Sequence, residues 1–220
     1  MTGDLLKAYA HHPFRVLGAR PSDTRTSLID RKADLLLFGD EKELDEALAS
    51  LLNPQLRLQA ELRWFPMTSD AEVSGLFARL VQAGVPELPR LQTESFLAQF
   101  NALRLALTRQ RARSVRELDA YLRALSIAAD ALLPRQVLEE INCDRRKAGF
   151  PAADDLGALE AGLEELFHET ARVLVGDAPG MYGQEACRTL GKNLEQAYRN
   201  AGSPYHNSYF LEIAAAELGA

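Results

Sequence analysis

The sequence has little of what marks a secreted, disulfide-stabilised or membrane-embedded protein. Its 220 residues include two cysteines and one tryptophan. Two cysteines, Cys143 and Cys187, do not make the disulfide framework of a small secreted protein. No apolar run reaches the roughly 18 residues that a membrane-spanning helix needs, and the N-terminus lacks a charged segment followed by an apolar one. We therefore expect a cytoplasmic protein that does not contact a membrane.

β-Branched residues are also sparse, and no segment alternates convincingly between apolar and polar residues. Leucine and alanine dominate instead, which favours helix over strand. A content of 47% hydrophobic and 25% charged residues is typical of a globular protein. The sequence therefore predicts an all-α fold, with a chain long enough for one large or two small domains.

The motifs of common enzyme families are missing. There is no glycine-rich phosphate loop, no nucleophilic serine on a strand-to-helix turn and no metalloprotease helix. We expect no enzymatic activity and no cofactor. A cysteine hydrolase is one alternative, because Arg145, Arg146 and Lys147 follow Cys143 and could lower the pKa of its thiol. A partly buried helical cysteine is the commoner situation.

Two histidine patterns could suggest a metal ion. Glu165 and His168 have the i, i+3 spacing of half a dinuclear carboxylate site, but such a site needs a second pair. His11 and His12 are adjacent, so their side chains point apart. We predict an exposed helix face for the first pair and a turn before Pro13 for the second, with no metal bound.

The net charge of −6 is unevenly distributed. Residues 151–220 carry 11 acidic and 4 basic side chains, which argues against a general nucleic-acid binder because counterion release needs clustered basic residues. One basic group, the arginine island, consists of Arg109, Arg111, Arg113 and Arg116. The dipole at a helix C-terminus explains much of such a group. The alternative is an anionic partner, either an acidic protein surface or nucleic acid, although no interleaved aromatics offer a stacking platform.

The most distinctive pattern lies between His12 and Pro66. It begins with Phe14-Arg15-Val16-Leu17-Gly18 and continues with a predicted helix over about 23–37, which the polar residues before it can cap. Phe38-Gly39-Asp40 breaks this helix, and a second helix begins near Glu41. Asn53-Pro54 then interrupts the chain, with the proline well placed to open a third helix. The first helix is expected to turn these residues toward the core: Leu28, Ala33, Leu35 and Leu36.

This pattern resembles the J domain, the helical hairpin module of DnaJ-type co-chaperones, over about residues 12–66. Phe14-Arg15-Val16-Leu17-Gly18 is similar to the entry motif of that family. Ala47-Leu48-x-x-Leu51-Leu52, followed by Asn53-Pro54-x-x-Arg57, resembles the end of its second long helix and the Asp-Pro-x-x-Arg that follows. The resemblance implies a helical hairpin and, for active members, a DnaK-type ATPase as the partner.

The chain departs from the family where the resemblance implies activity. Members that stimulate a DnaK-type ATPase carry His-Pro-Asp between the two long helices, whereas this chain has Phe38-Gly39-Asp40. The preceding helix also mixes acidic residues with its basic ones, so it would steer an acidic surface poorly. We therefore predict a divergent J-like domain that lacks co-chaperone activity.

The leading functional hypothesis is a non-enzymatic adaptor or accessory subunit that binds another protein. Its expected docking residues are Arg31, Lys32, Phe38, Gly39 and Asp40, with the arginine island as a second contact. An active, divergent co-chaperone that uses Asp40 and a nucleic-acid-binding accessory protein are the alternatives. The sequence carries no signal for oligomeric state.

A C-terminal helical domain is predicted over residues 67–220, after a J-like domain over residues 1–66. The connector is expected near 84–90, around Pro86-Glu87-Leu88-Pro89. Capping boxes are predicted at Ser69-x-x-Glu72 and Ser114-x-x-Glu117. Residues 178–183 are predicted to form a loop, and the last helix is expected near 205–218. The helix–break–helix rhythm suits a bundle or an irregular solenoid.

Overall fold

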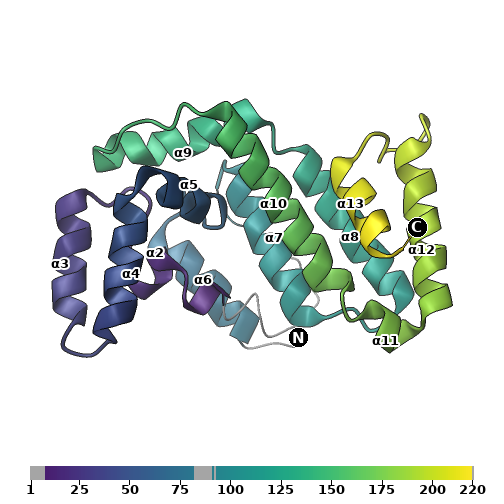
Figure 1. Ribbon diagram of the computed structural model, residues 1–220, viewed down its shortest axis with the longest axis horizontal. Helices are drawn as coiled ribbons and strands as arrows, with labels where there is room; N and C mark the ends of the chain where they lie inside the picture. Colours follow the sequence, from purple (N-terminus) through teal and green to yellow (C-terminus); the bar gives the residue numbers. More distant parts are fainter. Residues whose placement is uncertain (1–7, 82–90, 92, 220) are drawn as a thin grey trace.

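The computed structural model describes residues 8–81, 91 and 93–219. Over these ranges the chain is helical and contains no strand, which confirms the all-α prediction (Figure 1). None of the helices in this part of the chain is long and apolar enough to cross a lipid bilayer. The helices are α2 (Pro13–Val16), α3 (Arg25–Leu35), α4 (Glu41–Leu52), α5 (Pro54–Leu62), α6 (Asp70–Val81), α7 (Phe96–Gln110), α8 (Val115–Asp130), α9 (Pro134–Ala148), α10 (Leu156–Val175), α11 (Ala178–Tyr182), α12 (Gln184–Arg199) and α13 (Tyr209–Glu217).

Polar side chains fix where several helices begin, because their oxygens accept hydrogen bonds from otherwise free N–H groups of the first turn. The capping residues with such a bond include Thr24, Asp40, Asn53, Ser95, Ser114 and Asp155. The predicted capping box at Ser69 is reciprocal: Ser69 N donates to Glu72 Oε2 (3.1 Å) and Glu72 N donates to Ser69 Oγ (3.4 Å). At α8, Glu117 N donates to Ser114 Oγ as predicted, but the Glu117 carboxylate accepts from Arg113 N.

The first apolar cluster, called the N-terminal cluster, is built around aromatic rings. These are Tyr9, His12, Phe14, Trp64, Phe65 and Phe77. The His12 and Trp64 rings stack with centroids 4.6 Å apart. The hairpin of α3 and α4 joins this cluster through four buried residues, namely Leu28, Leu44, Ala47 and Leu51. The entry turn, the hairpin and the end of α5 thus share one core.

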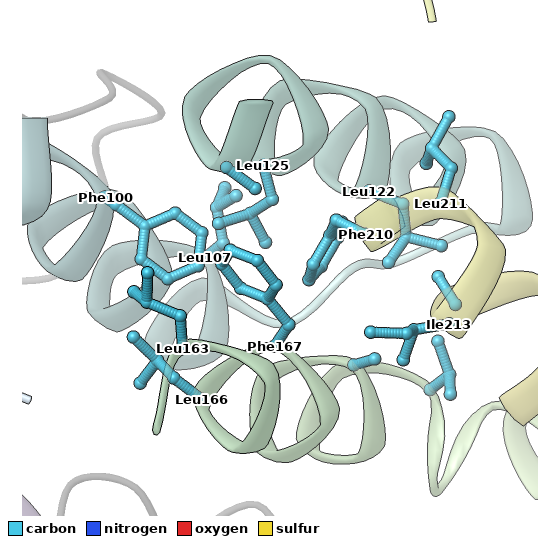
Figure 2. Close-up of a cluster of buried hydrophobic side chains, with 14 of the residues drawn as sticks. Phe100, Leu107, Leu122, Leu125, Leu163, Leu166, Phe167, Phe210, Leu211 and Ile213 are labelled. Atoms are coloured by element: carbon cyan, nitrogen blue, oxygen red, sulfur yellow. The ribbon is translucent and has the colours of Figure 1, made fainter. Parts of the chain in front are cut away.

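The second cluster, called the C-terminal cluster, fills the space between α7, α8, α10 and α13 (Figure 2). Phe100, Phe167 and Phe210 form its aromatic centre. Neighbouring rings meet edge to face, with centroids 5.6 Å apart for Phe100 and Phe167 and 6.1 Å apart for Phe167 and Phe210. Leucines from all these helices surround them, including Leu107, Leu122, Leu125, Leu163, Leu166 and Leu211. The cluster is therefore a helix-bundle core with a preferred aromatic geometry.

Two helices contribute to both clusters. In α5, Ala60 belongs to the N-terminal cluster while Leu58 and Leu62 belong to the C-terminal one. α7 divides in the same way, with Leu105 on one side and Leu107 on the other. The predicted connector near 84–90 lies outside the described residues, so the division at residue 66 stays a prediction. α5, before this connector, and α7, after it, both contribute apolar residues to the two clusters.

Three expectations about local structure were wrong. Residues 178–182 form the short helix α11 rather than a loop, because Pro179 fits the first turn of a helix, where no N–H bond is lost. The last helix begins at Tyr209, because a turn containing Asn207 at φ 63° precedes it. Ala33 of α3 and Leu36, the residue that follows α3, are exposed rather than buried. α3 packs mainly against α4, so a single stripe containing Leu28 suffices to attach it.

Candidate functional site

The loop between α3 and α4 presents an apolar tip made of Leu36, Leu37 and Phe38. Their exposed fractions are 40%, 79% and 89%. Large apolar side chains that are exposed next to one another on a surface are typical of an interaction site. Figure 1 shows α3 and α4 side by side at one end of the molecule, with this loop at the end of the hairpin. The predicted docking residue Phe38 is therefore accessible.

Gly39 and Asp40 shape the turn beneath the tip. The N–H groups of Phe38 and Gly39 both donate to the carbonyl of Leu35, at 3.0 and 2.9 Å, and end α3 in a tight turn. A Cβ added at Gly39 would lie 3.2 Å from Leu44 Cδ1 and 3.3 Å from Leu35 O, so a larger residue would crowd this turn. Asp40 Oδ1 accepts from Glu43 N at 3.0 Å and caps α4. The carboxylate of Asp40 is thus already used in a local structural bond.

Arg31 ties α3 to the segment before it, and Lys32 joins α3 to α4. Arg31 Nη1 donates to the carbonyl of Gly18 at 2.6 Å, and its Nε lies 2.9 Å from Asp23 Oδ2. Lys32 forms an ion pair with Asp45 of α4. Both cations are partly buried and have local acidic partners, so the hairpin presents apolar groups rather than free positive charge at its end.

The arginine island lies in and around the segment that joins α7 to α8. Arg109, Arg111, Arg113 and Arg116 are all exposed, and their side chains form no ion pair within the described ranges. The Tyr182 hydroxyl of α11 donates to the Ala112 carbonyl in the middle of this segment. The neighbouring Arg104 and Arg123 are separate, because they pair with Glu169 and Asp119 at 2.9 Å each.

The two predicted contact regions do not come together. α11, against which the island lies, is at the opposite end of the long axis from α3 (Figure 1). A partner touching both regions would have to span most of the molecule. Two separate contacts fit this arrangement better than one combined site.

The histidine patterns gather no metal-binding cluster in the part of the chain that the structure describes, and both cysteines are free. Cys187 is buried, and burial raises the pKa of its thiol, which is opposite to what a nucleophile needs. Cys143 is partly buried and free. Glu165 pairs with Arg63 at 3.1 Å, and His168 lies 3.9 Å from Glu217. No three His, Cys, Asp or Glu residues of the described ranges gather as a metal site would require.

His12 is the most perturbed titratable group among the candidates. Its ring is buried between aromatic neighbours, and Nε2 lies 3.1 Å from the Ala60 carbonyl. Nδ1 is buried without a hydrogen-bond partner, which places the proton of the neutral ring on Nε2. Burial lowers the pKa of His12 to about 3, with the charges of Arg63 and Arg104 acting in the same direction and the bond to Ala60 opposing them. His12 is thus a neutral structural donor, whereas His11 is exposed and contacts Glu43.

This burial makes folding sensitive to acid. Below pH about 6.5 the unfolded chain protonates His12 while the folded chain does not, so stability falls as the pH falls from there toward about 3. Between pH 8 and pH 5 this one group is expected to cost about 2 kcal/mol of unfolding free energy. His12→Gln keeps a donor for Ala60, and urea unfolding at both pH values should show a pH dependence smaller by that amount. His206→Gln, at an exposed histidine, is the control; equal pH dependence in the two variants would contradict the assignment.

The sequence did not predict a pocket that is lined by Arg25, Arg57 and Arg145. The i, i+4 spacing of Arg57 and Glu61 signals an ion pair within one helix. No local pattern indicates that Arg145, which lies 84 residues further along the chain than Glu61, donates to the same carboxylate.

Comparisons of this chain with protein-family models, with curated proteins and with solved structures found no match. What the protein binds has to be inferred from its own residues. The described surface offers three features for that purpose, namely the apolar tip, the arginine island and the arginine pocket.

Proposed function

We propose that this chain is a non-enzymatic adaptor that binds another protein through the apolar tip of its α3–α4 hairpin. The observation that carries the proposal is the exposure of Leu36, Leu37 and Phe38 as consecutive residues at the end of a protruding hairpin. Burying a leucine or phenylalanine side chain is worth about 1.5–3 kcal/mol. A partner with an apolar groove would therefore gain substantially from covering this tip.

The hairpin beneath the tip is held in place before any partner arrives. Leu28 and Leu44 anchor its two helices in the N-terminal cluster, and the Lys32–Asp45 ion pair joins them on the outside. A preorganised element loses less conformational entropy on binding than a disordered one. This supports docking as the role of the hairpin, with Arg31 and Lys32 acting as its supports.

The resemblance of residues 12–66 to the J domain also points to a protein partner. At the place of the family's His-Pro this chain carries Phe38-Gly39, which replaces a polar contact by an apolar one. Asp40 remains, but its carboxylate caps α4. An active, divergent co-chaperone of a DnaK-type ATPase is therefore the alternative, and an adaptor for another protein is favoured.

The arginine island is proposed as a second, separate contact. Four exposed guanidinium groups that form no ion pair in the described chain would attract an anionic surface and raise the rate of encounter. An acidic protein surface is preferred over nucleic acid, because the chain as a whole is acidic and the island is flanked by no exposed aromatic platform.

The tip can be tested by replacing Leu37 and Phe38 together with serine. Tagged chains would be used to capture proteins from the lysate of the source organism, and the binding of any recovered partner would then be measured with purified components. We expect the double variant to bind at least about tenfold more weakly, because it loses the burial of two apolar side chains. Ile127→Ser is the matched control, since Ile127 is 61% exposed on α8, away from the hairpin.

The same capture with and without ATP separates the two partner classes. A partner lost in the tip variant, kept in the Ile127→Ser control and indifferent to ATP supports the adaptor. A tip-dependent DnaK-type chaperone whose recovery changes with ATP would support the co-chaperone alternative instead. Equal binding by the tip variant and the control would refute docking through the tip.

A further inference from the structure

A pocket of about 300 Å³ opens where the N-terminal hairpin region meets α9 and the segment after it. This volume lies at the lower end of the range for small-molecule sites. Arg25, Arg57 and Arg145 line it on the polar side. Leu52, Phe150 and Pro151 provide apolar walls. The pocket thus combines several cationic groups with apolar surface in a space suited to a small molecule.

Two of the arginines are almost completely withdrawn from water. The exposed fraction is 1% for Arg57 and 3% for Arg145. Arg57 donates to Glu61 Oε1 (2.7 Å), to the Leu51 carbonyl (3.2 Å) and to the Pro21 carbonyl (2.6 Å). Arg145 donates to Glu61 Oε2 through Nε at 2.8 Å. Both guanidinium groups are therefore held rigidly, and the Arg57 group lies 3.7 Å from the ring centre of Phe150.

The pocket region carries more positive than negative charge. Glu61 is the carboxylate that both Arg57 and Arg145 share. The nearby buried Asp144 also acts on Arg57 through its charge, but it does not line the pocket; it accepts from Met67 N at 2.7 Å and pairs with Lys147 at 3.3 Å. Arg25 at the rim is exposed and has no ion pair in the described part of the chain. A pocket lined by cationic side chains attracts an anion.

The end of α9 lies beside the pocket. Its last carbonyls are already satisfied, because Phe150 N donates to the Arg145 carbonyl at 3.0 Å and Gly149 N to the Arg146 carbonyl at 3.3 Å. The lining residues bring no acidic side chain to the pocket. The lining therefore favours a negatively charged ligand.

We infer that this pocket binds a small organic oxyanion, a carboxylate or a phosphate monoester, with its charged end toward Arg25, Arg57 and Arg145. Guanidinium groups match both oxyanions because their N–H donors are arranged in a planar fork. The apolar body of the ligand lies against Leu52 and Phe150. This inference stands apart from the adaptor proposal, since the pocket uses none of the residues of the apolar tip.

Nuclear magnetic resonance can test the inference with three probes, namely phenyl phosphate, benzoate and inorganic phosphate. We expect saturable shifts of the Phe150 backbone amide and of the Arg57 and Arg145 Nε–H signals with at least one of the two aromatic probes. Which of them binds more tightly identifies the oxyanion. Inorganic phosphate lacks the apolar body and is expected to bind more weakly than phenyl phosphate. Equal affinity for these two would overturn the apolar part of the inference.

Two variants locate the binding without touching the buried ion pairs. Arg25→Ala removes the exposed rim cation and should weaken the better probe about tenfold, the value of one hydrogen bond to a charged group. Ala152→Trp keeps every charge but fills the pocket, and should abolish the saturable shifts. Arg109→Ala makes the same charge change in the arginine island and should leave the affinity unchanged. No saturable shift with any probe, or unaltered affinity in the Ala152→Trp chain, would overturn the site.

Discussion

Replacing Glu61 with glutamine is expected to lower the free energy of unfolding by about 3–5 kcal/mol, the range for breaking a buried ion pair on one side. Glu61 is 1% exposed and receives hydrogen bonds from two guanidinium groups. Glutamine keeps the shape of the side chain but removes the charge and turns an NH₂ group toward donors. Arg57 and Arg145 would then be buried with no carboxylate between them.

The protonation of Glu61 follows from two opposing influences. Burial raises the pKa of the Glu61 carboxyl, while hydrogen bonds and charge from Arg145 and Arg57 act to lower it. Burial likewise lowers the pKa of Arg57, but a guanidinium stays protonated in proteins. The stability of the triad formed by Arg57, Glu61 and Arg145 therefore depends on the carboxylate keeping its charge. Glutamine imitates the state in which that charge is lost.

A matched control separates burial from the chemistry of the substitution. Glu46 pairs with Lys42 at the same i, i+4 spacing, but both side chains are well exposed and lie 3.8 Å apart. Glu46→Gln should cost no more than about 0.5 kcal/mol. Urea unfolding of both variants measures the difference. If Glu61→Gln costs as little as Glu46→Gln, the triad contributes no more than a surface pair.

The parts of this fold that the sequence predicts are those determined by neighbours in the chain. Caps at Ser69 and Ser114 could be predicted because the capping oxygen and the N–H group it accepts from lie three residues apart. The helix predicted to open at Pro54 does begin there, because proline fits the first turn of a helix. The prediction of a loop over 178–183 was wrong, because a proline fits the start of a helix as well as a turn.

The features that the sequence could not predict depend on which helices meet. An amphipathic pattern shows that one face of a helix is apolar, but it does not show how many neighbours will cover that face. α3 has one main neighbour, so Leu36 stays in water although the pattern favoured burial. Phe38 was predicted as a docking residue from its place in the turn of the J-like hairpin; it is 89% exposed, and its docking role stays a prediction. The link from Arg145 to Glu61 needed the packing of α9 on α5 and has no local signal.

Glu140 provides a second long-range contact of large expected effect. It lies on α9 and is 6% exposed, yet it caps α7. Its Oε2 accepts from Ser95 Oγ at 2.7 Å and from Leu97 N at 3.3 Å, and its Oε1 accepts from Phe96 N at 3.1 Å. A carboxylate at this position also interacts favourably with the positive end of the α7 dipole. One side chain thus satisfies three donors and joins two helices.

Glu140→Ala is expected to lower the free energy of unfolding by about 2–4 kcal/mol, because a buried donor left without its partner costs about 1–3 kcal/mol and the three losses overlap. Glu139→Ala is the control on the same helix, since Glu139 is exposed and pairs only with the exposed Arg146 at 2.7 Å; its cost should stay below about 1 kcal/mol. Hydrogen exchange should quicken at the amides of Phe96 and Leu97 in the Glu140 variant alone. Unchanged exchange there, with equal stability in the two variants, would mean that Ser95 caps α7 without help from α9.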